Sequence, residues 1–145
     1  MTTVQFIKAS QEPEILQLPL FADRCQAGFP SPATDYAEAE LDLNAYCIRR
    51  KSSTFFVRAI GNSMTDIGLH SGDLMVVDKA ETPIHGDIVI AEIEGEFTVK
   101  RLLLSGRTPS LQAMNPAYPT LTPDPDSLSI FGVVTAFVHK TRGGE

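Results

Sequence analysis

Ser63 and Lys100 are the residues whose side chains could together carry out nucleophilic chemistry. A serine hydroxyl becomes a good nucleophile when a neighbouring base removes its proton. A lysine can be that base if burial lowers the pKa of its amine. Ser63 lies in the stretch GNSMT (61–65), directly after an expected strand. A turn there would present the hydroxyl beside backbone N–H groups that could receive an oxyanion.

Both residues also have a purely structural interpretation. The spacing of Ser63 and Asp66 is that of a capping box, in which the serine only begins a short helix. Lys100 lies in an expected strand and could extend its ammonium group to solvent. On spacing alone the structural interpretation is favoured for both residues, so the surroundings of Lys100 decide between the two.

The strands that hold Lys100 can be placed in register from the sequence. The segment GDIVIAEIEGEFTVKRLLL (86–104) predicts two strands joined at Glu94-Gly95. If these two residues form the turn, Ile93 faces Glu96 and Val89 faces Lys100. The face that carries Lys100 then also holds Ala91, Thr98 and Leu102. We therefore expect mostly apolar neighbours, which disfavour the ammonium form of the lysine.

Other catalytic or metal chemistry finds little support in the sequence. The hydrolase motif G-x-S-x-G is absent, and the histidines do not form a metal-spaced set. We expect each of them to lie in a loop or on the surface: His70, His85 and His139. Cys25 and Cys47 form no C-x-x-C motif. The sequence therefore predicts no metal site and no cofactor.

The rest of the chain predicts a mainly β protein with an extended N-terminal arm. Residues 1–36 contain four prolines and no sustained periodicity, so we expect an arm with few elements of its own, followed by a β-rich domain over residues 37–145. A short helix is expected within 41–50. Besides 86–104, strands are expected over 54–59, 73–78 and 127–140, the last with a bend at Gly132. Short strands separated by turn signals favour a twisted, partly closed β-structure.

Composition narrows the classes of partner. The net charge is −6 and the one basic cluster, at 49–51, is three residues long. The basic surface that phosphate contacts require is therefore missing, and we expect no strong direct binding of nucleic acid. No apolar run approaches the roughly 20 residues of a membrane span, and the N-terminus lacks the pattern of a secretory signal. We expect a cytoplasmic protein without membrane contact.

Four motifs together resemble the LexA/UmuD family of self-cleaving proteins. They are PLFADRCQAGFPSPATDY (19–36), GNSMTDIGLHSGDLMVVD (61–78), HGDIVIAEIEGEFTVKRL (85–102) and FGVV (131–134). The resemblance runs over nearly the whole chain. It implies the fold of the LexA C-terminal domain, which signal peptidases share in part.

The resemblance also implies the site residues. Ser63 matches the family nucleophile and Lys100 matches its general base. Ala27-Gly28 matches the bond that is cut. The backbone N–H of Ser63, with that of Asn62, is implied as the oxyanion hole.

The resemblance favours the UmuD branch, the mutagenesis proteins of the bacterial SOS response. LexA-type repressors carry a DNA-binding domain before the cut, whereas only 27 residues precede it here. Cleavage is then expected to be slow until the chain meets a filament of RecA on single-stranded DNA. The processed homodimer would serve a UmuC-type polymerase in error-prone translesion synthesis after DNA damage.

Two alternatives remain open from the sequence. In the first, the chain is a non-catalytic interaction module: residues 1–36 bind a partner, Ser63 is a helix cap and Lys100 is exposed. In the second, it is a signal-peptidase-like enzyme that cuts other proteins. The absence of a membrane anchor in the sequence weakens the second alternative.

Overall fold

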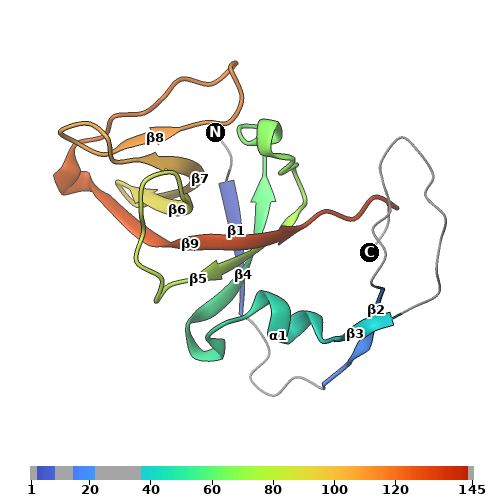
Figure 1. Ribbon diagram of the computed structural model, residues 1–145. Coiled ribbons are helices and arrows are strands. Elements are labelled where there is room, and N and C mark those ends of the chain that lie inside the picture. The colour runs from blue at the N-terminus through green and yellow to red at the C-terminus, as the bar shows by residue number, and fades with distance from the viewer. Residues whose placement is uncertain (1–2, 9–14, 22–36, 144–145) are drawn as a thin grey trace. The chain divides into compact units, whose positions relative to one another are not determined.

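The computed structural model of the chain describes residues 3–8, 15–21 and 37–143 (Figure 1). By their contacts the residues divide into two compact units, one of residues 1–9 with 50–145 and one of residues 10–49. Within the described residues, no helix is long and apolar enough to cross a membrane.

The larger unit is built on one antiparallel sheet. Its strands, in the order in which they pair, are β1 (Thr3–Lys8), β4 (Thr54–Ile60), β5 (Leu74–Asp78), β9 (Leu128–Val138), β6 (Ile88–Ile93), β7 (Glu96–Leu103) and β8 (Ser110–Gln112). Short 3₁₀ helices in this unit are Lys51–Ser53, Thr65–Ile67 and Pro125–Ser127. All the expected strands of the β-rich domain are therefore present.

The smaller unit contains β2 (Leu18–Phe21), β3 (Ala37–Leu41) and helix α1 (Leu43–Cys47). β2 and β3 pair antiparallel. The helix begins after Asp42, whose carboxylate accepts a hydrogen bond from the backbone N–H of Asn44. A short helix within 41–50 is thus confirmed.

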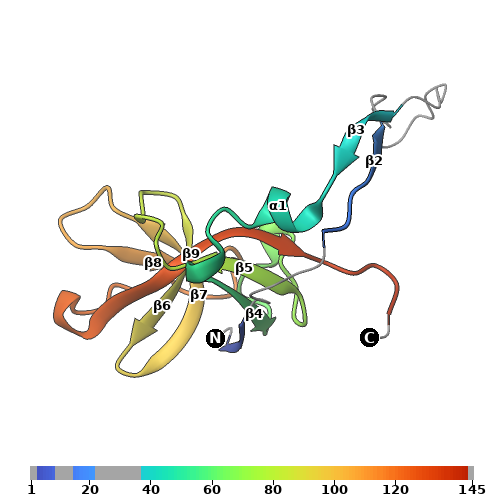
Figure 2. The same cartoon turned by 90° about the horizontal axis from the view of Figure 1, so that it is seen from below.

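β9 is the long central strand of the sheet, and Figure 2 shows it from below. Its second half pairs with β5 and its first half pairs with β6. The register with β6 shifts beside Gly132, where a bend was expected. A Cβ on Gly132 would lie 2.7 Å from Val77 Cγ1 and 3.1 Å from the carbonyl oxygen of Asp78. Only glycine therefore allows β9 to approach β5 this closely.

The sheet curls until β1, at one end of the strand order, lies against β7. The Phe6 ring of β1 meets the rings of Phe97 and Phe131 edge-on, with centroids 5.0 and 4.8 Å apart. Edge-to-face contacts of this kind stabilise aromatic pairs. The prediction of a twisted, partly closed β-structure is confirmed.

The N-terminal segment contains two strands, β1 and β2, that were not among the strands expected from the sequence. β1 pairs with β4 along its whole length, from Thr3 opposite Ile60 to Lys8 opposite Phe55. The expectation rested on the prolines and the weak periodicity of this segment. β1 is instead stabilised by its pairing with β4, which is distant in sequence, and by Val4, which packs on the core. The separation of an arm at residue 36 from a catalytic domain stays a prediction.

Candidate active site

Lys100 is buried in the middle of β7. Its partner in β6 is Val89, and Ile93 pairs with Glu96, so the predicted register is confirmed. The turn residues Glu94 and Gly95 have φ values of 51° and 85°, as a type I′ turn requires. Lys100 is 2% exposed, which rules out a side chain extended to solvent.

Burial changes the acid–base properties of Lys100. Removing an ammonium group from water disfavours its charged form. This desolvation lowers the pKa of Lys100 from 10.5 to about 8. At pH 7 about a tenth of the Lys100 side chains are then neutral amines, and only the neutral amine can accept a proton.

Three oxygen atoms surround the Lys100 amine. Its Nζ lies 3.1 Å from Ser63 Oγ, 2.9 Å from Thr98 Oγ1 and 3.1 Å from the carbonyl oxygen of Val99. A neutral amine has two N–H donors and one lone pair. If Thr98 and Val99 accept the two N–H bonds, the lone pair is left for the hydroxyl proton of Ser63. This arrangement suits proton transfer from Ser63 to Lys100.

Ser63 lies in the turn that follows β4 and is completely buried. Gly61 has a φ of 107°, a conformation that glycine adopts without strain. The capping-box interpretation is wrong: the 3₁₀ helix Thr65–Ile67 has Met64 as its N-cap residue and no side-chain capping bond. The Ser63 side chain therefore does not cap this helix, and its hydroxyl lies beside Lys100 instead.

A segment that the sequence analysis did not single out braces the Ser63 turn. Asn115 Nδ2 donates a hydrogen bond of 2.8 Å to the carbonyl oxygen of Asn62. The carbonyl oxygen of Met114 accepts a bond of 2.8 Å from the N–H of Asp66. The N–H of Met114 lies 3.4 Å from Met64 Sδ. These contacts join the turn to the loop after β8, and no local motif in the sequence signals them.

The bracing matters because Asn62 and Ser63 share a peptide group. In a trans peptide the N–H points opposite to the C=O. When Asn115 holds the Asn62 carbonyl, it also fixes the direction of the Ser63 N–H. The role of this N–H, and of that of Asn62, in an oxyanion hole stays a prediction. The expected cleavage bond, Ala27-Gly28, lies outside the described residues.

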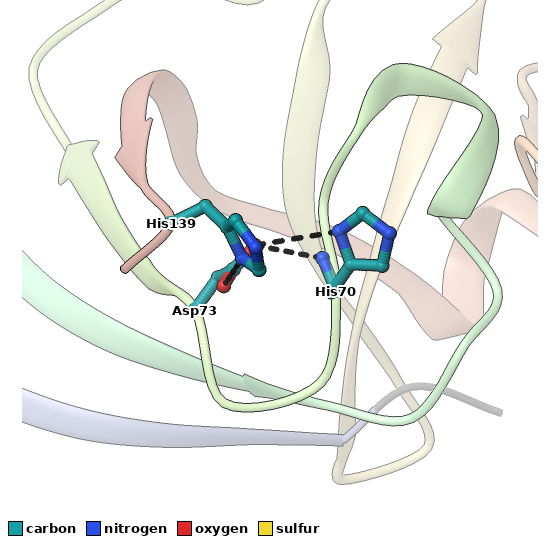
Figure 3. A group of neighbouring side chains, drawn as sticks. All are labelled: His70, Asp73 and His139. Atoms are coloured by element: carbon teal, nitrogen blue, oxygen red, sulfur yellow. Dashed lines mark hydrogen bonds and ion pairs between the residues drawn. The ribbon is translucent and has the colours of Figure 1, made fainter. Parts of the chain in front are cut away.

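The histidines are exposed or close to the surface, as expected. His85 Nδ1 accepts a hydrogen bond of 2.8 Å from the N–H of Leu104. The other two histidines are not isolated, however: His70 and His139 both lie close to Asp73 (Figure 3). Their spacing along the chain gave no sign of this group.

A curled antiparallel sheet that buries a serine beside a lysine is the arrangement expected of a serine peptidase fold. The chain belongs to the Peptidase S24-like family, whose model matches residues 19–135. The resemblance to the LexA/UmuD family is thereby confirmed, and with it the peptidase class.

Several proteins of bacteria are similar to this chain over most of their length. The chain is 68% identical to Protein SamA of Salmonella typhimurium, over 94% of this chain and 95% of that protein. It is 46% identical to Protein MucA of Escherichia coli, over 91% of each. It is 38% identical to the LexA repressor of Shewanella loihica, over 94% of this chain but 68% of the repressor. The repressor is thus longer than the matched region.

Proposed function

We propose that this protein is a self-cleaving serine peptidase of the UmuD type, in which Ser63 is the nucleophile and Lys100 the general base. The observation that carries the proposal is the 3.1 Å separation of Lys100 Nζ from Ser63 Oγ in a buried site. The lowered pKa of Lys100, about 8, supports it because the base must be neutral to act.

The reaction follows from these two side chains. Lys100 takes the hydroxyl proton as Ser63 Oγ attacks the carbonyl carbon of Ala27. The developing oxyanion would be held by the N–H of Ser63, with that of Asn62. Lys100 then returns the proton to the amine of Gly28, which leaves as a new N-terminus. Water hydrolyses the ester that joins Ala27 to Ser63, which restores the hydroxyl and releases residues 1–27.

The proposal includes regulation. A filament of RecA on single-stranded DNA would bind the conformation in which Ala27 lies at Ser63 more tightly than other conformations of the chain. This difference in affinity raises the fraction of chains that are ready to be cut. The processed chain, as a homodimer, would then act with a UmuC-type polymerase in SOS mutagenesis. The similarity to the LexA/UmuD family supports this part of the proposal.

The interaction-module alternative loses two of its premises. It required Ser63 to be a helix cap and Lys100 to be exposed. The helix cap is Met64, and Lys100 is 2% exposed. A buried lysine beside a buried serine has no evident use in a protein that only binds partners, since burial of the amine is costly.

Cleavage in the presence of the filament tests the proposed function. The full-length chain is incubated near neutral pH with RecA, single-stranded DNA and a slowly hydrolysed ATP analogue, and the products are identified by mass. We expect a fragment that begins at Gly28, formed much faster than without RecA. Ser63→Ala should give none, whereas Ser52→Ala, at an exposed serine, should behave as the unmodified chain. The same rate with and without the filament would overturn the regulatory part alone.

A further inference from the structure

His70, Asp73 and His139 form a group at one edge of the larger unit, drawn in Figure 3. His70 belongs to the loop between the 3₁₀ helix Thr65–Ile67 and β5, Asp73 directly precedes β5, and His139 directly follows β9. One ligand atom from each side chain lies within 4.8 Å of the other two. In the described part of the chain, no other three histidine, cysteine or acidic side chains come together in this way.

Asp73 is the fixed member of the group. Its side chain is 5% exposed, and Oδ2 accepts a hydrogen bond of 2.8 Å from the backbone N–H of His70. The other oxygen, Oδ1, lies 2.6 Å from His139 Nδ1. The carboxylate is thus anchored through one oxygen and presents the other to the histidine pair.

The two imidazoles have room to adjust around this carboxylate. The side chains of His70 and His139 are 50% and 44% exposed, and their ring centroids are 5.0 Å apart. His70 Nδ1 lies 4.0 Å from Asp73 Oδ2 and 2.8 Å from the carbonyl oxygen of Gly68. Rotation of either exposed ring moves its nitrogen without disturbing the core.

We propose that these three residues bind a divalent transition-metal ion of the zinc class. Two imidazole nitrogens and one carboxylate are a donor set that zinc accepts, with a fourth position left for water. Metal–ligand bonds of about 2.0–2.1 Å in a tetrahedral site place donor atoms about 3.3 Å apart. His139 Nδ1 lies 2.6 Å from Asp73 Oδ1, and His70 Nδ1 lies 4.0 Å from the other oxygen, Oδ2, so both exposed rings must rotate to bring their nitrogens to this distance from Oδ1. Imidazole donors disfavour calcium and magnesium, which take oxygen ligands.

Binding has a defined proton balance. Metal ions bind imidazole nitrogens that carry no proton. In the absence of metal, His139 Nδ1 faces Asp73 Oδ1 and His70 Nδ1 faces the carbonyl oxygen of Gly68, so the proton of each neutral ring lies on Nδ1. On binding, each ring gives its Nδ1 proton to solvent and takes one up at Nε2, which leaves Nδ1 free for the metal and the charge of the ring unchanged. The bound ion would tie the end of β9 to the loop that leads from the Ser63 turn into β5.

Titration with cobalt(II) and zinc(II) tests the site. The full-length chain is used with Ser63→Ala, so that it stays intact, at pH 7.5. We expect one ion per chain by calorimetry with zinc, and a visible absorption band with cobalt. His70→Gln and His139→Gln should each weaken binding at least tenfold. His85→Gln, which removes the remaining histidine, should leave the affinity unchanged.

Three results would overturn the proposal. The first is no binding by the unsubstituted site at millimolar metal. The second is an affinity in His70→Gln or in His139→Gln that equals the affinity of the chain with both histidines. The third is an intense near-ultraviolet band with cobalt, which indicates thiolate ligands and would place the ion at cysteine instead. The thermal midpoint of each metal-free variant is measured as the control for folding.

Discussion

Asn115 Nδ2 donates a hydrogen bond of 2.8 Å to the carbonyl oxygen of Asn62, the residue before Ser63. Asn115 also holds its own loop, since its Oδ1 accepts a bond of 3.0 Å from the N–H of Ala117. A side chain 53 residues away in sequence thus fixes the peptide group that ends at the Ser63 nitrogen.

Asn115→Ala should slow self-cleavage by about tenfold to hundredfold, because misplacing a reacting group by about 1 Å costs that much. Asn115 is a positioning residue and does not contact Lys100, so the pH midpoint of the rate should stay where it is. The rate is followed by gel or mass analysis at a series of pH values. Asn44→Ala, at an exposed asparagine of α1, is the matched control. A changed midpoint would mean that Asn115 acts through the base.

The rate of self-cleavage without RecA should rise with pH and then level off. Lys100 must be neutral to accept the Ser63 proton, and its pKa is lowered to about 8. The neutral fraction therefore grows about tenfold between pH 7 and pH 9 and changes little above pH 9. The check is the first-order rate from pH 6 to 10, with circular dichroism to show that the chain stays folded. A flat profile would exclude Lys100 as the base.

Thr98→Val should shift this profile to lower pH. Thr98 Oγ1 accepts a hydrogen bond from Lys100 Nζ, and an acceptor stabilises the ammonium form more than the neutral amine. Loss of this hydrogen bond is expected to lower the pH midpoint of the rate by about one unit. It should also lower the maximal rate, because the bond no longer orients the amine. Thr98→Ser retains a hydroxyl and should restore both quantities. If the valine and serine variants have the same midpoint, the bond has no effect on the base.

Burial of Lys100 should also appear in the stability of the protein. Its folded-state pKa of about 8 lies below its ordinary value of 10.5, so between these pH values the unfolded chain binds more protons. The free energy of unfolding of the lysine-containing chain should therefore rise with pH across this window, by about 3 kcal/mol relative to Lys100→Met. Below pH 8 the full desolvation penalty of the ammonium remains.

Urea unfolding of the two chains at pH 7 and pH 10.5 measures this difference. Both chains carry Ser63→Ala, so that neither cuts itself. Lys140→Met, at an exposed lysine, controls for the loss of one positive charge. If the chain with Lys100 and the Lys100→Met variant differ in stability by the same amount at both pH values, burial does not lower the pKa of Lys100 as described.

Local sequence signals were enough to predict the parts of the site that lie within one hairpin. The Glu94-Gly95 turn sets the register that buries Lys100, because side chains alternate between faces from a fixed starting point. Strands β4, β5 and β9 were likewise visible as runs of β-branched and aromatic residues bounded by turn signals.

Contacts between distant segments could not be predicted in this way. β1 pairs with β4 across about fifty residues, and its few apolar residues show no period of their own. Asn115 reaches Asn62 only because the loop after β8 folds over the Ser63 turn. His139 meets His70 because β9 ends beside the start of β5. Such contacts depend on the topology of the sheet, which one sequence does not reveal.

Mass spectrometry of the purified full-length chain after incubation at pH 10 without RecA is the most direct test of the Ser63–Lys100 pair. We predict two fragments, residues 1–27 and residues 28–145, from the unmodified chain. Ser63→Ala and Lys100→Ala should each remain full-length, whereas Ser52→Ala should cleave normally. A fragment that begins at Gly28 in the Ser63→Ala sample, or an intact unmodified chain, would contradict the assignment.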